Sequence, residues 1–255
     1  MQIQEVFDRR RFVFLDGGMG TQLQQRGLQP GQKPELAALE MPDVLTAIHR
    51  DYTAAGADIL LANTFGANAK KLAGCGRSVE EVVSASIACA RRAGQETSAL
   101  VALDIGPLGE LLAPAGTLAF EDAYEEFAQV IRAGAAAGAD LVFLETMTDL
   151  YELKAAILAA KENCNLPVFT SMSFESRGRT FTGCTVESYA VTAAGLGADA
   201  IGINCSLGPA EILPFAQRLC RSVPAGLPVF VKPNAGLPNA RRQTSFASLE
   251  VMPEL

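Results

Sequence analysis

The chain has 255 residues, 49% of them hydrophobic and 19% charged, which is enough to bury one large core or two small ones. Its 21 basic and 28 acidic residues give a net charge of −7. This balance argues against binding to nucleic acid or to an anionic membrane surface, because both need clustered cations.

The sequence carries no recognisable membrane or export signal. No apolar run approaches the roughly 18 residues of a membrane-spanning helix. The apolar stretch near the N-terminus, residues 12–15, is too short for a signal peptide. The six cysteines, at positions 75, 89, 164, 184, 205 and 220, show no short paired spacing. Together these features predict reduced thiols and a cytoplasmic protein.

Seven short apolar runs recur along the chain, with helical patterns between them. Each run is almost continuously apolar, as expected for a strand buried on both faces of a parallel sheet. The runs begin about 36 residues apart on average, the length of one strand–loop–helix–loop unit. They are residues 12–15, 58–62, 100–103, 141–144, 167–170, 200–203 and 228–231.

The predicted helices share characteristic residues at their ends. Segments 55–58, 137–140 and 196–199 all contain Gly-Ala-Asp directly before a strand, where glycine suits the end of a helix. Asp43 is expected to cap the start of the helix that Gly56 ends. A helix after every strand, without a break in composition, predicts an α/β protein with a TIM-type (β/α)8 barrel. A doubly wound open sheet is the alternative.

The spacing would place an eighth strand at about residue 265, beyond Leu255. Residues 239–255 contain no convincing strand, and their composition differs from that of the preceding units. We therefore expect one domain over residues 1–238, a barrel truncated after strand seven. We expect residues 239–255 to form an atypical, poorly ordered tail.

Polar residues follow the apolar runs. C-terminal strand ends form the active-site mouth of a (β/α) barrel, so these side chains are expected to converge. Any one of them is equally explained as the place where a strand leaves the core. Their repetition, with three carboxylates among them, favours a site. They are Asp16, Asn63, Thr64, Asp104, Glu145, Ser171, Asn204, Cys205, Lys232 and Asn234.

Segment 16–21, Asp-Gly-Gly-Met-Gly-Thr, follows the first run. Its glycines would let main-chain N–H groups approach an anionic group closely, although a plain tight turn explains the segment equally well. The segment is not a dinucleotide fingerprint, because Leu23 stands in place of the third glycine. It also lacks the Gly-Lys-Ser/Thr ending of a P-loop.

Three other residues bear on catalysis. His49, the only histidine, lies on a predicted helix and is interpreted as a surface or packing residue, which makes Ser–His or Cys–His catalysis improbable. Cys205 is the only cysteine at a strand end. Lys232 supports a minor alternative, a lyase that forms a Schiff base through this lysine.

Taken together, these motifs resemble the homocysteine S-methyltransferase family. The resemblance runs from about residue 10 to residue 238, in the family's order, through segments 16–23, 63–68, 104–107, 145–147, 202–206 and 232–236. It implies a (β/α)8 barrel that holds one zinc ion through three cysteines. It also implies transfer of a methyl group to the thiol of homocysteine, forming methionine. The methyl donor, whether cobalamin, a folate or a sulfonium, stays open.

The resemblance also assigns residues. It places the ligand's ammonium on Asp104 and Glu145, and its carboxylate on the main chain of residues 18–20 and on Thr21. This agrees with the preference of carboxylates for cations and of exposed N–H groups for anions. Zinc would convert the homocysteine thiol to the nucleophilic thiolate. The implied substrate-binding residues are Gly18, Met19, Gly20, Thr21, Asp104, Glu145 and Asn234, and the implied zinc ligand is Cys205.

The sequence departs from the family at the other two zinc ligands. In the family these are adjacent cysteines in a Gly-Gly-Cys-Cys segment at strand eight, which this sequence lacks. We therefore expect weak zinc binding and no measurable methyl transfer by the chain alone. The alternative is a non-catalytic truncated barrel that only binds or assembles. Open barrel edges at strands one and seven predict self-association.

Overall fold

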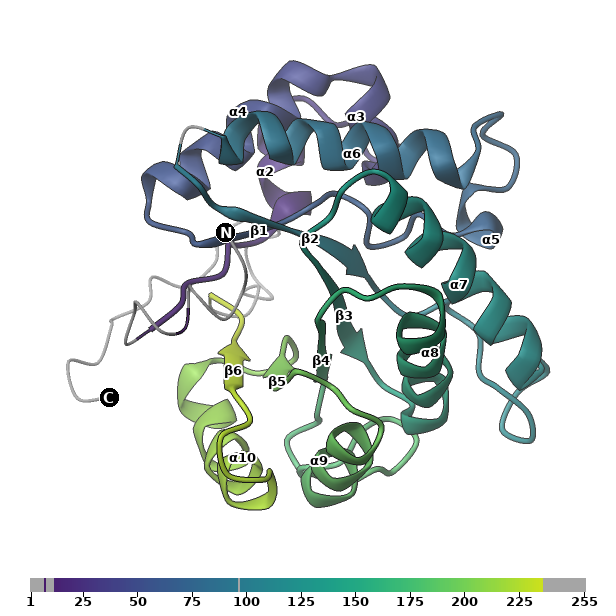
Figure 1. Cartoon of the computed structure of the whole chain (residues 1–255), viewed down its shortest axis with the longest axis vertical. Coiled ribbons are helices and arrows are strands. Elements are labelled where there is room, and N and C mark those ends of the chain that lie inside the picture. The colour runs from purple at the N-terminus through teal and green to yellow at the C-terminus, as the bar shows by residue number, and fades with distance from the viewer. Residues whose placement is uncertain (1–6, 8–11, 96, 236–255) are drawn as a thin grey trace.

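The computed structural model describes residues 7, 12–95 and 97–235 (Figure 1). In this part of the chain, six parallel strands form one sheet in the order β1-β2-β3-β4-β5-β6. Each strand therefore pairs with the next strand in the chain. The strands are β1 (Ile59–Leu61), β2 (Leu100–Ile105), β3 (Leu141–Met147), β4 (Val168–Met172), β5 (Ala200–Asn204) and β6 (Val229–Lys232).

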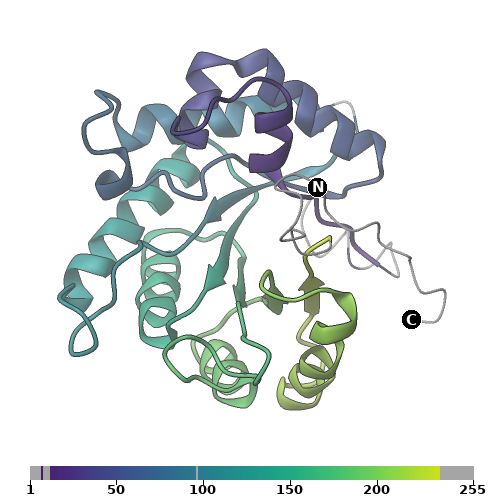
Figure 2. The same cartoon turned by 180° about the vertical axis from the view of Figure 1, so that it is seen from behind.

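Helices follow the strands and form an arc around the outside of the curved sheet (Figures 1 and 2). The strand order runs in one direction without the reversal that defines a doubly wound sheet, which excludes that alternative. The architecture is an open half-barrel of TIM type. The helices are α2 (Met19–Gln25), η1 (Pro34–Leu36), α3 (Ala37–Glu40), α4 (Pro42–Ala54), α5 (Ala69–Leu72), α6 (Val79–Gly94), α7 (Phe120–Ala136), α8 (Leu150–Asn163), α9 (Val186–Gly195) and α10 (Pro209–Ser222).

The prediction of seven strands is wrong by one, because residues 12–15 form no strand. Leu15 makes only an isolated parallel bridge to Ile59. The main-chain N–H of Phe14 donates to the Asp58 carboxylate at 2.9 Å, so a side chain takes the place of a ladder carbonyl. Phe12 and Phe14 remain 63% and 58% exposed. An apolar run therefore marks this segment correctly as extended, but its pairing is too sparse for a strand.

The predicted Gly-Ala-Asp helix endings are confirmed. Gly56, Gly138 and Gly197 have φ angles of 101°, 86° and 83°, the left-handed conformation that glycine adopts without strain. The aspartates that follow have a role that the pattern did not predict. Asp140 accepts a hydrogen bond from Val101 N at 2.7 Å, and Asp199 accepts one from Val168 N at 2.8 Å. Each aspartate thereby ties the start of its own strand to the neighbouring strand.

Of two predictions about α4, the one about Asp43 is wrong and the one about His49 is narrowed to one of its two readings. The helix starts at Pro42 with Met41 as its N-cap, so Asp43 lies in the first turn rather than at the cap. Proline is favoured at the first helical position because its missing N–H would be unpaired there anyway. His49 is fully buried, and neither of its nitrogens has a hydrogen-bond partner. It is therefore a packing residue and not a surface one, and burial lowers its pKa to about 4.

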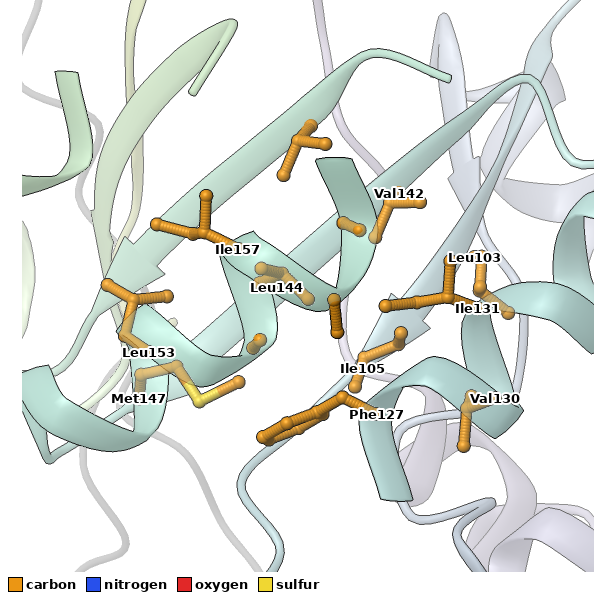
Figure 3. Close-up of a cluster of buried hydrophobic side chains, with 14 of the residues drawn as sticks. Leu103, Ile105, Phe127, Val130, Ile131, Val142, Leu144, Met147, Leu153 and Ile157 are labelled. Carbon is orange, nitrogen blue, oxygen red and sulfur yellow. The ribbon is translucent and has the colours of Figure 1, made fainter. Parts of the chain in front are cut away.

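The core has two layers, one on each face of the sheet. Side chains of β2 and β3 that point outward pack against α7 and α8, as Figure 3 shows. Side chains that point inward form a second cluster, which includes Phe143 and Phe169, with Phe230 packed against it. Gly202 makes room for this cluster, because a Cβ there would lie 2.4 Å from the Phe230 ring.

The predicted tail, residues 239–255, lies outside the described residues, as do the last residues of the predicted domain. Among the helices of the described part, none is long and apolar enough to span a membrane.

Candidate functional site

The alternation of side chains between the two faces of each strand brings the site residues together. In β2, β3 and β5 the inward series runs from apolar residues such as Leu100, Phe143 and Ala200 to a polar residue at the C-terminal end. These polar ends are Asp104, Glu145 and Asn204, and Lys232 ends β6 in the same way. The apolar interior thus forms a floor, and the polar side chains gather above it at one end of the sheet.

Two carboxylates contact one lysine, and a third, that of Asp104, is close enough to interact electrostatically with all three groups. The ammonium of Lys232 lies 3.2 Å from Glu145 Oε2 and 3.9 Å from Asp16 Oδ1. Asp16, which follows the predicted first run, also accepts a hydrogen bond from Leu61 N at 2.8 Å through Oδ2. Asp16, Asp104 and Glu145 are each at least nine-tenths buried. The structure therefore confirms that these three strand-end carboxylates converge.

Burial sets the protonation of two of these carboxyl groups. It raises the pKa of Asp16 to about 7, although Lys232 and the Leu61 hydrogen bond oppose the shift. It also raises the pKa of Asp104 well above its usual range, with Glu145 adding to the shift and Lys232 opposing it. Asp16 Oδ1 and Asp104 Oδ1 are buried without a hydrogen-bond partner. The site thus offers two unused acceptors to a cationic ligand group.

Lys232 keeps its charge in this setting. Burial alone would lower its pKa, but Glu145, Asp16 and Asp104 together raise the pKa above its ordinary value. A Schiff base forms only from the neutral amine. The geometry therefore argues against the lyase alternative.

Asn204 links the carboxylates to the cysteine at the end of β5. Its amide nitrogen donates to Thr146 Oγ1 at 2.7 Å and to Glu145 Oε2 at 3.3 Å, and it lies 3.5 Å from Cys205 Sγ. Its carbonyl oxygen accepts from Ser171 Oγ at 2.9 Å. Fully buried, Asn204 thus fixes the ends of β3, β4 and β5 relative to one another.

Cys205 lies at the mouth in a strained turn. Its φ is 57° and that of Ser206 is 58°, left-handed values that are uncommon outside glycine. The Cys205 N–H donates to the Lys232 carbonyl at 3.1 Å, and Thr146 Oγ1 lies 3.7 Å from the sulfur. Burial raises the pKa of the thiol, so the isolated side chain stays protonated at neutral pH. Backbone strain of this kind is found preferentially at functional sites.

The glycine-rich segment forms the start of a helix. Gly18 is the N-cap of α2, and its φ of −69° is open to any residue. The Gly18 carbonyl accepts hydrogen bonds from Tyr52 Oη at 3.0 Å and from Thr21 Oγ1 at 3.4 Å. A Cβ on Gly20 would meet no heavy atom within 4 Å. Carboxylate binding by Gly18, Met19, Gly20 and Thr21 stays a prediction.

Asn234 lies close to the Cys205 turn. Its main-chain N–H donates to the Leu207 carbonyl at 3.1 Å, and the Leu207 N–H in turn donates to the Cys205 carbonyl at 2.6 Å. The segment after β6 is thereby tied to the loop after β5. The proximity of Asn234 to a metal stays a prediction.

The cysteines present do not fit a three-cysteine zinc site. All six lie within the described residues, and Cys205 alone follows a strand of the sheet directly. Cys184, for example, lies in the loop before α9 and donates to the Thr185 carbonyl at 3.2 Å. In the described part of the chain, no three histidine, cysteine or acidic side chains are grouped to hold a metal ion. Zinc sites use three or four protein ligands.

The residues that the resemblance assigned to ligand and zinc do not include Asp16, Asn204, Lys232 or Thr146, all of which the structure places in the network. The first three were predicted only as strand-end residues that converge at the mouth. For Asn204 and Lys232, the inward series along β5 and β6 was a usable indication, since each is two residues beyond an interior position. Asp16 was recognised as a strand-end residue but not assigned to the ligand. Thr146 falls between the inward positions of β3, so the alternation of side chains places it on the other face of the sheet. Its positive φ of 61° turns the chain there, and the side chain joins the site.

Comparisons with known proteins agree with this geometry. A model of the family described as homocysteine S-methyltransferase matches residues 13–253. Methionine synthases of Mycobacterium tuberculosis and Mycobacterium leprae are each 35% identical to this chain over a 252-residue alignment that covers 90% of the chain. The chain spans 20% of the length of these relatives.

Solved structures support the fold. The metallated form of the homocysteine methyltransferase MmuM from Escherichia coli matches with a TM-score of 0.81 at 24% identity, covering 92% of this chain and 87% of that one. Its oxidized form matches with a TM-score of 0.79 over 91% of this chain and 85% of that one, also at 24% identity.

The sheet, the strand-end site and the family match together define an α/β half-barrel of the methyltransferase type. The chain belongs to the homocysteine S-methyltransferase family. The resemblance to this family, predicted from the motifs, is confirmed.

Proposed function

We propose that this chain binds L-homocysteine at the C-terminal ends of its strands, as part of a protein that transfers a methyl group to the homocysteine thiol and forms methionine. The observation that carries the proposal is the convergence of three buried carboxylates near one thiol, with Asn204 linking Glu145 to Cys205. Carboxylates recognise the ammonium of an amino acid, and the thiol marks where a sulfur-containing end would lie.

In this proposal the ligand's ammonium binds Glu145 and Asp104, with Asp16 beside them. Two buried oxygens, Asp16 Oδ1 and Asp104 Oδ1, accept no hydrogen bond within the protein, which supports this orientation. The ligand's carboxylate faces the main chain of residues 18–20 and Thr21. Its thiol then points toward Cys205 and Asn234, at the opposite side of the Asn204 network.

The reaction class follows from the ligand. The homocysteine thiol gives up its proton to solvent, and its sulfur forms a bond to the methyl carbon. The bond between that carbon and the donor breaks, and the donor departs with its electron pair. The side chains of this protein orient the amino acid and exclude water. Because the thiols present do not fit a zinc site, no step is assigned to zinc. The methyl donor is a cobalamin, a folate or a sulfonium.

A second candidate function is binding without catalysis. The single strand-end thiol favours it, because one cysteine does not hold a zinc ion firmly. In either case we propose a cytoplasmic location. The six cysteines show no short paired spacing in the sequence, which supports a reducing compartment.

Calorimetric titration with L-homocysteine under reducing conditions tests the binding proposal. Glu145→Gln should weaken the affinity at least tenfold, because an amide replaces the charge that faces the ammonium. Glu187→Gln is the matched control, since Glu187 forms an exposed ion pair with Arg218. Unchanged affinity in Glu145→Gln would remove the assignment. A methyl-transfer assay with each donor class then separates the two candidate functions.

A further inference from the structure

The candidate ammonium site already holds an ammonium group of the protein itself. Lys232 contacts Glu145 at 3.2 Å, and its side chain is 21% exposed. Among the described basic residues, only Lys232 influences the charge state of both Asp16 and Asp104. The same ammonium lies 5.9 Å from the centre of the Phe143 ring, so an aromatic face also favours the cation there.

This arrangement creates a competition. A ligand ammonium that binds Glu145 meets Lys232 at the same carboxylate, and two cations at one carboxylate repel each other. A lysine has a flexible stem of four carbons and a compact charge, so its ammonium can move by a change of rotamer. Once displaced, it needs an anionic partner in its new position. An amine supplies none, whereas an amino acid supplies its own carboxylate.

We propose that Lys232 is a specificity-determining residue: it occupies Glu145 in the free protein and pairs with the ligand's carboxylate in the complex, so that the site accepts zwitterionic amino acids and rejects simple amines. The inference rests on the proposed function, because it takes the ligand's ammonium to bind Glu145. It extends that proposal by giving the protein's own cation a role in selection. Residues 18–20 lie next to Asp16, so they and Lys232 can share the two oxygens of one carboxylate.

The first test compares L-homocysteine with 3-aminopropanethiol, which is the same molecule without its carboxylate. Calorimetric affinities are measured for the unmodified chain, for Lys232→Met and for Lys154→Met. Methionine keeps an apolar stem but carries no charge. Lys154, exposed on α8, is the matched control because its ammonium also lies over an aromatic ring, that of Phe120.

In the unmodified chain and in Lys154→Met, the amino acid should bind at least about 100-fold more tightly than the amine. In Lys232→Met this ratio should fall at least tenfold, because the amine loses its competitor and the amino acid loses a partner. An unchanged ratio, with homocysteine binding still dependent on Glu145, would overturn the role of Lys232 and leave the proposed function standing. Absence of Glu145-dependent homocysteine binding would overturn both.

A second test needs no amino acid ligand. Lys232→Ala removes three carbons and the ammonium, the equivalent of n-propylamine. Propylammonium chloride should therefore raise the Tm of Lys232→Ala by about 2 °C or more over sodium chloride, by mass action on the folded state. It should not do so for the unmodified chain or for Lys154→Ala. An equal response of all three proteins would show that Lys232 fills no discrete cation site.

Discussion

Asn204 and Thr146 exchange hydrogen bonds at the centre of the site. The Thr146 N–H donates to Asn204 Oδ1 at 3.0 Å, and the Asn204 amide donates to Thr146 Oγ1 at 2.7 Å. Thr146 directly follows Glu145 and has a φ of 61°, which is unfavourable for a β-branched residue. The Asn204 side chain, at the end of β5, therefore holds the end of β3 in a strained conformation. It thereby also fixes the position of the Glu145 carboxylate.

Removal of this pair should cost stability. Asn204→Ala leaves the Thr146 N–H and the Ser171 hydroxyl without their buried partner, so we expect the free energy of unfolding to fall by about 2–4 kcal/mol. Urea denaturation measures this change. Asn163→Ala is the matched control, because Asn163 bonds to Tyr124 and Arg132 near the surface. Its loss should cost about 1 kcal/mol or less. Equal losses in the two variants would contradict a special role for Asn204.

The main features of this fold were predictable because they depend on local patterns. Continuous apolar runs identified all six strands of the described residues, and Gly-Ala-Asp identified three helix ends. Residues 12–15 were mistaken for a strand because apolarity reports burial or extension, but not hydrogen bonding to a neighbour. Here the Asp58 side chain, 44 residues further along the chain, accepts the hydrogen bond from the Phe14 N–H.

The site was only partly predictable for a related reason. Strand-end position indicated that Asp16, Asp104 and Glu145 converge, since that follows from the parallel sheet. It did not reveal that Lys232 lies on Glu145, because a side-chain contact across 87 residues depends on rotamers. Nor did it reveal the link through Asn204. Its partners depend on the positive φ at Thr146, which no sequence pattern marks.

Zinc binding offers a direct check on the lone strand-end thiol. After reconstitution and dialysis, the purified chain should retain well under one zinc ion per molecule, because each absent ligand leaves the ion more hydrated and less fixed. Elemental analysis measures the ratio. Cys205→Ser should remove most of what remains, and Cys220→Ser, which alters an exposed cysteine, should not. Tight one-to-one zinc in the unmodified chain would show that a thiol such as Cys184 is recruited to the mouth.

Glu152 should make the stability of the protein depend on pH. The residue is 3% exposed, and its carboxyl group accepts a hydrogen bond from Leu108 N at 2.7 Å. Burial raises the pKa of this carboxyl group to about 7. The folded state thus binds its proton more tightly than the unfolded state does. The stabilisation is complete below the ordinary pKa of 4.5 and is lost as the pH rises to about 7.

Glu152→Gln should flatten this part of the pH profile. The amide keeps an oxygen acceptor for Leu108 N and does not ionise, so at pH 8 the variant should be more stable by about 1–2 kcal/mol. Below pH 4.5 the two proteins should be similar. Urea denaturation from pH 4 to 8 gives the two curves. Parallel curves would mean that Glu152 ionises without cost in the folded protein.

The two edges of the half-barrel should control self-association. In the described part of the chain, β6 pairs only with β5, and the segment beside β1 exposes 58% of Phe14. Val231, on β6, is 40% exposed. Unpaired N–H and C=O groups beside apolar side chains are a template for another strand. Phe14→Lys and Val231→Lys should therefore lower the fraction of oligomer in sedimentation velocity, because a charge on an edge opposes pairing.

The control is Phe181→Lys, which changes another exposed phenylalanine, in the loop before α9. This variant should leave the oligomer fraction as it is. If Phe181→Lys is as effective as the edge variants, association proceeds through exposed apolar surface in general and not through the strand edges.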